Sequence, residues 1–366
     1  MSIIIIGCGL SGVVIADRIT SQLKKKVTII EKRDHIGGNC YDYIDEETGI
    51  RINKYGAHIF HTNNERVWEY INKFSEWIRY EHKVLSKVDD MLVPIPVNCT
   101  TINAINNTQM TPDEAKIWLE SKQETYDKIE NSEQMAKSKI GNTLYDKLMK
   151  HYTFKQWNKY PEMLDKSVLE RIPIRYDFNP NYFNDKYQAL PKYGYTYFFK
   201  KLLDNPLITV HLNTNYVKND NDIVIYTGPI DHYFADKGLP KLEYRSILFD
   251  IKHYDIPYFQ TNSVINYPSK DTTYTRSVEY KHFTNQYNFI KNKTVVVSET
   301  TTDDGEPYYP VPNNQNKQLY EKYQEYALLE SNVYFVGRLA NYKYYNMDEA
   351  INNALLFADK FNTDNK

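Results

Sequence analysis

The first forty residues constrain the fold more than any other part of the chain. The apolar run at 2–7 is short enough for a buried strand, and "GCGLSG" follows it directly. "VVIADRIT" then has apolar residues at helical spacing, and "KVTIIE" at 26–31 has the pattern of a second strand. This order predicts a βαβ unit of the Rossmann type, which begins at the first residues of the chain.

The glycines of this unit have the spacing of a dinucleotide site. Gly7 would make the tight turn, Gly9 would let the backbone approach a pyrophosphate, and Gly12 would let helix and strand pack closely. The helix N-terminus would receive the phosphates, and Glu31 would accept hydrogen bonds from ribose hydroxyls. Ser11 and Lys32 lie beside these positions and are further cofactor candidates.

The continuation of this motif favours FAD over NAD. Gly37, Gly38 and Asn39 follow the second strand closely, an extension that is typical of FAD proteins of the two-segment type. Of the 13 glycines, none forms a second glycine-rich phosphate loop. A separate NAD(P)H domain is therefore not expected, so either the substrate itself is oxidised or the flavin works without net redox change.

Length, charge and cysteine content limit the class of protein. A chain of 366 residues with 41% hydrophobic content can form two or three domains with their own cores. A formal net charge of -2 argues against nucleic-acid binding. We find no signal peptide, no membrane-spanning segment and no metal-ligand spacing among the three cysteines, so we expect a cytoplasmic protein.

The remaining pattern predicts an α/β protein with a Rossmann-like FAD-binding domain, a helical insert and a mostly antiparallel β-sheet domain. Residues 63–78 have helical spacing, 82–96 have the pattern of a hairpin, and 99–151 are helical, with a capping box at Thr111 and Glu114. Several extended stretches follow residue 222. The predicted domains are the FAD domain at 1–80, 192–230 and 312–366, the insert at 97–155, and the sheet domain at 81–96, 156–191 and 231–311.

Arginine is scarce in this chain, with ten among the 45 basic residues. Arg175, Arg276 and Arg338 therefore stand out, because lysine cannot replace the planar, bidentate guanidinium where phosphate is held.

Several further segments resemble one family in their order along the chain. They are "YGAHIFHT" (55–62), "YTFKQW" (152–157), "RIPIRYDFNPNYFNDKYQALP" (171–191), "TGPID" (227–231), "YTRSVEYKHF" (274–283), "EPYYPV" (306–311) and "GRLANYKYYNMDEAI" (337–351). These segments resemble the UDP-galactopyranose mutases, particularly those of bacteria. The resemblance runs from residue 1 to about 355 and is weakest at 99–140.

This resemblance implies a redox-neutral flavoenzyme that interconverts UDP-galactopyranose and UDP-galactofuranose. N5 of the reduced FAD would form a covalent adduct with the sugar while UDP leaves and later returns. The partners would be a UDP-sugar, an external reductant and a second copy in a homodimer. Three alternatives remain open: a mutase of another UDP-hexose such as UDP-N-acetylgalactosamine, a flavin oxidase of the amine-oxidase type, and a nucleotide-binding protein without activity.

The resemblance also implies residue roles. Arg175 and Arg276 would hold the diphosphate, and Tyr187, Tyr309 and Tyr344 would donate hydrogen bonds to it. The uracil and sugar contacts would come from Tyr152, Thr153, Trp157, Asn266 and Asn98. His61 would place its backbone carbonyl near the flavin, and Arg338 would lie against the flavin and favour its reduced form. Further cofactor contacts would come from His58, Ile59, Gly337, Asn346 and Met347.

Two positions depart from the family pattern. Ala57 stands where many relatives have proline, in the turn before His58. Asn346 stands where relatives usually carry aspartate, which removes one negative charge near the flavin. Asn346 and Glu349 still form an N-x-x-E pair, so a helix cap is expected there.

Overall fold

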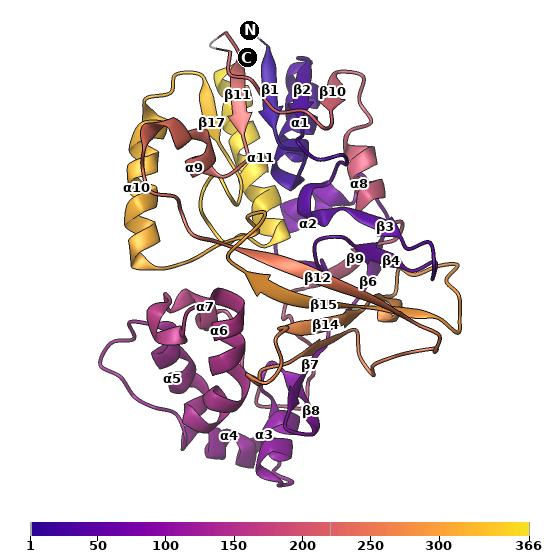
Figure 1. Cartoon of the computed structure of the whole chain (residues 1–366), viewed down its shortest axis with the longest axis vertical. Helices are drawn as coiled ribbons and strands as arrows, with labels where there is room; N and C mark the ends of the chain where they lie inside the picture. Colours follow the sequence, from indigo (N-terminus) through magenta and orange to yellow (C-terminus); the bar gives the residue numbers. More distant parts are fainter. Residues whose placement is uncertain (1, 220, 366) are drawn as a thin grey trace.

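The computed structural model describes residues 2–219 and 221–365. A parallel sheet forms one end of the molecule, a second sheet crosses the middle, and a group of helices forms the other end (Figure 1). Within the described ranges, no helix is both long and apolar enough to cross a membrane.

The parallel sheet is built on the predicted βαβ unit. Its five strands lie in the order β10 (Ile208–His211), β2 (Val27–Ile30), β1 (Ile3–Ile6), β11 (Ile223–Tyr226) and β17 (Val333–Phe335). All four pairings are parallel, and all five strands come from the segments predicted to form the FAD domain. Because β1 and β2 are buried, their isoleucines form the centre of this core.

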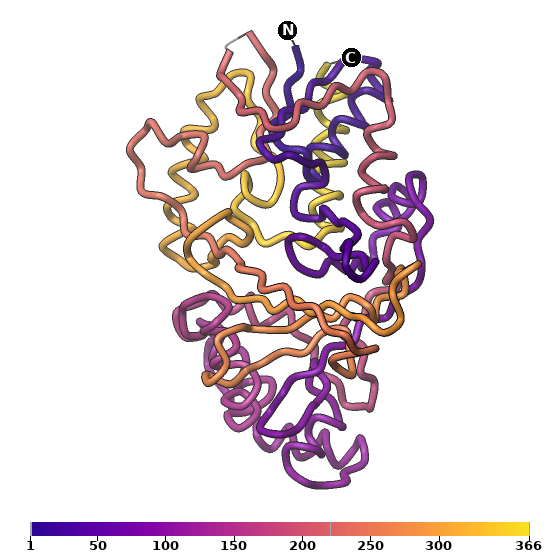
Figure 2. Tube along the Cα trace, turned by 45° about the vertical axis from the view of Figure 1, so that its right-hand side comes forward, coloured from indigo at the N-terminus to yellow at the C-terminus, as the bar shows by residue number. Residues whose placement is uncertain are grey.

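Helices from distant parts of the chain cover this sheet. They are α1 (Leu10–Leu23), α2 (Glu65–Ile71), α8 (Tyr195–Leu202), α10 (Asn314–Leu328) and α11 (Met347–Asp364). α1 packs against α11 and α8, so the first and last parts of the chain lie side by side, as the tube view also shows (Figure 2).

The second sheet has seven strands and runs through the middle of the molecule. Their order is β16 (Tyr309–Pro310), β12 (Tyr244–Tyr254), β15 (Thr294–Thr302), β14 (Arg276–Glu279), β13 (Val264–Asn266), β7 (Val84–Val88) and β8 (Met91–Ile95). Only β13 and β7 pair in parallel. This agrees with the mostly antiparallel sheet and with the hairpin expected at 82–96.

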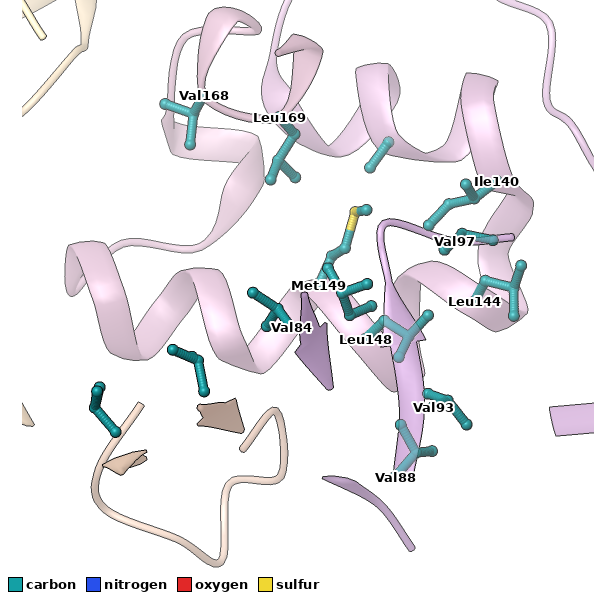
Figure 3. Packing of buried hydrophobic residues seen from close by; sticks show 14 of the residues in the cluster. Val84, Val88, Val93, Val97, Ile140, Leu144, Leu148, Met149, Val168 and Leu169 are labelled. Atoms are coloured by element: carbon teal, nitrogen blue, oxygen red, sulfur yellow. The ribbon is translucent and has the colours of Figure 1, made fainter. Parts of the chain in front are cut away.

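The helical group packs against β7 and β8. It contains α3 (Cys99–Asn106), α4 (Pro112–Glu120), α5 (Ser132–Tyr145), a π-helical turn at Asp146–Lys150, α6 (His151–Trp157) and α7 (Ser167–Glu170). The predicted capping box is present at the start of α4. Aliphatic side chains of the hairpin meet those of α5, the π-helical turn and α7 in one core (Figure 3).

The chain also forms two small sheets and a short helix. β3 (Asp42–Ile44) pairs with β4 (Arg51–Asn53), β9 (Tyr187–Pro191) pairs with β5 (Phe60–Thr62) and β6 (Trp77–Arg79), and α9 (Ile230–Tyr233) follows β11.

The helix expected at 63–78 is too long. It ends at Ile71, and Trp77 begins strand β6, where its ring packs on Phe60 and Phe198. Tertiary packing of this aromatic residue therefore overrides the helical spacing. β9 also pairs with strands from 1–80, although it lies in the range predicted for the sheet domain; the domain limits stay a prediction.

Candidate functional site

A cavity of about 720 Å³ opens at the carboxyl ends of β1, β2 and β11. Open α/β sheets bind ligands at this edge, and the volume lies within the roughly 300–1,000 Å³ of small-molecule sites. The predicted cofactor residues that line this cavity are Gly7, Gly9, Ser11, Glu31, Lys32, Gly38, Asn39, His58, Arg338 and Met347.

Glycines are required around this cavity because backbone segments approach one another closely. A Cβ on Gly7 would lie 2.3 Å from Oγ1 of Thr227, and Gly7 has a φ of +104°. A Cβ on Gly12 would lie 2.1 Å from the carbonyl oxygen of Gly7, and one on Gly38 would lie 2.9 Å from Cα of Gly9. The dinucleotide loop therefore excludes side chains at Gly7, Gly12 and Gly38, whereas a Cβ on Gly9 would make only an ordinary contact, 3.8 Å from Cα of Gly38.

Glu31 is held in place by two backbone amides. Its Oε2 accepts a hydrogen bond from N–H of Cys8 at 2.8 Å, and its Oε1 accepts one from N–H of Arg33 at 2.9 Å. An ionised carboxylate can accept about four hydrogen bonds, so two positions remain for ribose hydroxyls. Lys32 lies at the rim and pairs with Glu306 at 2.7 Å.

His58 and Arg338 line the cavity on its side toward the seven-stranded sheet. The Nδ1 atom of His58 lies 2.7 Å from the carbonyl oxygen of Gly56. Burial, together with the charges of Arg338 and Arg276, lowers the pKa of His58 to about 4, so His58 is neutral at pH 7. Gly337 is not one of the lining residues, but it packs against one. A Cβ on Gly337 would lie 2.8 Å from Oγ of Ser11, which lines the cavity.

Arg338 also contacts a pair of tyrosines outside the cavity. Its guanidinium carbon lies 5.6 Å from the ring centroids of both Tyr309 and Tyr344. These two rings stack on each other with centroids 5.3 Å apart. On Tyr344 a second guanidinium, that of Arg171, lies 4.2 Å from the ring centroid.

The charge around Tyr344 is strongly positive. Burial alone would raise the pKa of its phenol, but Arg171, Arg338 and Arg276 together lower it below the usual value. Burial and the neighbouring Tyr344 raise the pKa of Tyr309 to about 12, so that hydroxyl keeps its proton. Three cations, one of them paired with Glu299, and two phenols thus form a site suited to a dianionic ligand.

Arg276 is fixed by a carboxylate on the neighbouring strand. Its Nε donates to Oε2 of Glu299 at 2.6 Å, and the two residues are register partners in β14 and β15. Burial alone would lower the pKa of this guanidinium, but Glu299 raises it well above its ordinary value. Asn266, at the end of β13, is the register partner of Arg276 on its other side.

Helix α6 supplies aromatic side chains next to the group formed by Arg171, Arg276, Arg338, Tyr309 and Tyr344. The ring of Trp157 lies 5.9 Å from that of Tyr344, and both Trp157 and Thr153 are almost fully buried. Burial raises the pKa of Tyr152, which lies close enough to Arg276 for that charge to oppose the shift. The structure therefore places Tyr152 near Arg276 and Trp157 near Tyr344, while the contact of Thr153 with substrate stays a prediction.

Arg175 and Tyr187 make other contacts. Nη2 of Arg175 donates to the carbonyl oxygens of Asn181 at 2.6 Å and Phe183 at 3.2 Å, within the loop that follows α7. The hydroxyl of Tyr187 donates to Glu65 at 2.6 Å, and its ring stacks on Trp68. Their contacts to phosphate stay predictions.

His61, Asn98, Ile59 and Asn346 have structural partners. Nδ1 of His61 lies 2.9 Å from Oδ2 of Asp185. The side chain of Asn98 is fully buried and accepts a hydrogen bond from N–H of Thr101 at the start of α3. Ile59 packs beside the core of the seven-stranded sheet. At the start of α11, N–H of Asn346 donates to Glu349 at 2.7 Å.

Arg171 and Glu299 belong to this site but were not among the sequence candidates. The scarcity of arginine could have identified Arg171, which lies four residues before Arg175. No sequence signal identifies Glu299, because its place depends on the register of β14 with β15.

Comparison with known proteins gives the family to which the chain belongs. A family model described as UDP-galactopyranose mutase matches residues 147–344, more than half of the chain, and a model of a NAD(P)-binding Rossmann-like domain matches 5–74. A probable UDP-galactopyranose mutase of Klebsiella pneumoniae is 38% identical, with 98% of this chain and 94% of the relative covered. The chain belongs to the UDP-galactopyranose mutase family.

Other relatives show the range of this family. A dTDP-fucopyranose mutase of Escherichia coli is 35% identical over 100% of this chain and 99% of the relative. A UDP-galactopyranose mutase of Mycoplasma genitalium is 37% identical over 95% of this chain and 92% of the relative. Membership of the family confirms the resemblance read from the sequence and makes the chain a flavoprotein isomerase with a dinucleotide cofactor.

Solved structures confirm the predicted fold class. The crystal structure of a reduced UDP-galactopyranose mutase superposes with a TM-score of 0.78 at 18% identity, covering 98% of this chain and 95% of the other. A putative protoporphyrinogen oxidase from Exiguobacterium superposes with a TM-score of 0.70 at 12% identity, covering 99% of both chains.

Proposed function

We propose that this protein interconverts UDP-galactopyranose and UDP-galactofuranose with bound, reduced FAD. One observation carries the proposal: Arg338 lines the dinucleotide cavity and also lies over Tyr309 and Tyr344, beside Arg171 and Arg276. The reactive end of a cofactor and an anionic substrate would therefore meet at this arginine.

The cavity fits FAD in its chemistry. Gly7, Gly9 and Gly38 leave the backbone open to a pyrophosphate, and Glu31 retains acceptors for ribose. His58 and Arg338 would face the isoalloxazine. When bound in reduced form, this group supplies a nucleophilic nitrogen for the anomeric carbon with no net oxidation of the sugar.

The residues of the chain bind and orient the nucleotide sugar. Arg171 and Arg276 would hold the diphosphate, so that the nucleotide can leave the anomeric carbon and return to it without diffusing away. Tyr309 and Tyr344 would donate hydrogen bonds to the same oxygens. Tyr152 would stack on the base, and Trp157 would close the sugar pocket against water.

A turnover experiment tests the proposal. After anaerobic reduction with a stoichiometric amount of dithionite, the protein should convert many equivalents of UDP-galactopyranose while the flavin absorbance stays bleached. An oxidase whose flavin is already reduced would convert no substrate, because no electron acceptor is present to reoxidise it. Purification without yellow absorbance would instead support a nucleotide-binding protein that does not use flavin.

Which nucleotide sugar the protein prefers is a separate question from the type of reaction. The 35% identity to a dTDP-fucopyranose mutase favours a second candidate, a mutase of the same mechanism on another nucleotide sugar. A panel of UDP-galactose, UDP-N-acetylgalactosamine and dTDP-fucose, with chromatography of the furanose products, would separate these activities by kcat/KM.

The proposal includes a compartment and partners. The cysteines Cys8, Cys40 and Cys99 are all buried and free, which agrees with the reducing cytoplasm. An external reductant would keep the flavin reduced. Two copies of the chain would form a homodimer, as the resemblance to the bacterial mutases implies. Light scattering of the purified holoprotein tests the homodimer directly.

A further inference from the structure

Lys155 of helix α6 inserts its ammonium group into a ring of backbone carbonyls. Its Nζ lies 2.5 Å from the carbonyl oxygen of Tyr267, 2.9 Å from those of Ser269 and Thr272, and 3.0 Å from that of Tyr274. We call this arrangement the four-carbonyl site. The acceptors are neutral, so the lysine organises the loop at 267–275 without forming an ion pair.

This loop joins two strands that carry site residues. Asn266 ends β13 before the loop, and Arg276 begins β14 immediately after it. The two residues are register partners, so the loop closes a hairpin whose base is the Asn266–Arg276 pair. Movement of the loop would therefore move the start of the strand that presents Arg276.

The helix that carries Lys155 supplies the other half of the substrate site. Tyr152 lies three residues before Lys155, and Trp157 lies two residues after it. The backbone at Lys155 is itself tied to the sheet, because its carbonyl oxygen accepts hydrogen bonds from Oγ1 of Thr301 and from Nη2 of Arg245. Lys155 thus connects α6 to the hairpin through its side chain and to β12 and β15 through its carbonyl.

We propose that Lys155 is a positioning residue that sets the spacing between the nucleoside-binding face of α6 and the diphosphate-binding Arg276. This inference rests on the proposed function. A nucleoside diphosphate spans both parts, so its affinity depends on their separation, whereas the reacting carbon of the sugar would lie toward the cofactor cavity beside Arg338, which neither part carries.

The test replaces Lys155 with methionine, which keeps the apolar stem and removes the ammonium. We expect K155M to raise the Kd of UDP and the KM of the UDP-sugar at least tenfold, while kcat at saturation stays within about threefold and bound flavin is unchanged. K155Q retains an amide donor, so its Kd should lie between those of wild type and K155M.

The chain offers a matched control in Lys281. Its Nζ is also surrounded by backbone carbonyls, those of Pro257, Lys291 and Lys293 at 2.7, 2.6 and 2.8 Å, in a second part of the same sheet domain. K281M removes the same kind of contact at the other end of β14, so it should lower thermal stability without changing the Kd of UDP.

The outcomes are separable. If wild type does not bind UDP, the proposed function fails. If wild type binds UDP and K155M binds it equally well, the positioning role of Lys155 is wrong. Equal loss of UDP affinity in K281M would overturn it too, because the effect would then be one of general stability. If K155M does not fold, the K155Q Kd decides, with an unchanged value overturning the proposal.

Discussion

Arg276 and Glu299 face each other across β14 and β15, and Nε of the arginine lies 2.6 Å from Oε2 of the carboxylate. Glu299 is 1% exposed, and among the described residues its Oε1 has no hydrogen-bond partner. The carboxylate therefore fixes the direction of the guanidinium through one oxygen, while its second oxygen is buried without a partner among the described residues.

Replacing Glu299 with alanine should lower kcat/KM by about 10–100-fold, because a hydrogen bond between charged groups contributes about 1.5–3 kcal/mol. Steady-state kinetics of the reduced protein measure this effect. Glu279→Gln is the control, since Glu279 is also buried on β14 but accepts hydrogen bonds from Phe259 and Gln260. A control variant with the same catalytic loss would assign the effect to folding.

Arg171→Lys should raise the KM for the nucleotide sugar by about 10–100-fold, because lysine loses the planar, bidentate contact to phosphate. The guanidinium of Arg171 lies 4.2 Å from the ring of Tyr344, in the group that also contains Arg276. Arg66→Lys, on the exposed surface of α2, is the matched control. An unchanged KM in the Arg171 variant would remove this residue from the diphosphate site.

Asn346→Asp should lower the midpoint potential of the bound flavin, because the added charge opposes the anionic reduced form. Asn346 immediately precedes Met347, which lines the cavity. About 1–2 kcal/mol of repulsion corresponds to about 20–40 mV for a two-electron couple. Spectroelectrochemical titration measures the shift, with Asn365→Asp at the other end of α11 as control. An equal or higher potential for Asn346→Asp would disprove the expectation.

His82 should make the folded protein sensitive to mild acid. Burial, together with the charges of Arg276 and His61, lowers its pKa to about 3. A histidine in the unfolded chain takes up its proton near pH 6.5, so stability is lost as the pH falls from 7. Between pH 7 and pH 5 wild type should lose about 2 kcal/mol more than His82→Phe.

Urea denaturation of both proteins at the two pH values measures this difference, with FAD at the same concentration in every sample. His82→Phe keeps an aromatic ring beside Phe183, so packing is largely retained. Equal losses of stability in the two proteins would show that His82 does not carry the pH dependence.

Local pattern was sufficient for much of the fold. The glycine spacing at 7, 9 and 12 and the apolar strands at 3–6 and 27–30 predicted the parallel sheet, because a dinucleotide turn restricts backbone geometry within a few residues. The prediction of a helix at 63–78 was wrong at its C-terminal end. Trp77 belongs to strand β6, because its ring packs against rings from distant segments.

The site residues also fall into those that local pattern predicts and those that only the tertiary structure brings together. The sequence by itself determined the cofactor motif and the ordered segments that identify the family, because these depend on residue type and spacing. Only the tertiary structure decided that Arg171 lies against Tyr344 and that Glu299 orients Arg276. It also decided that Lys155 binds the loop that precedes Arg276. These contacts join residues 23 to 173 positions apart, and strand register and helix packing, which no local pattern encodes, bring them together.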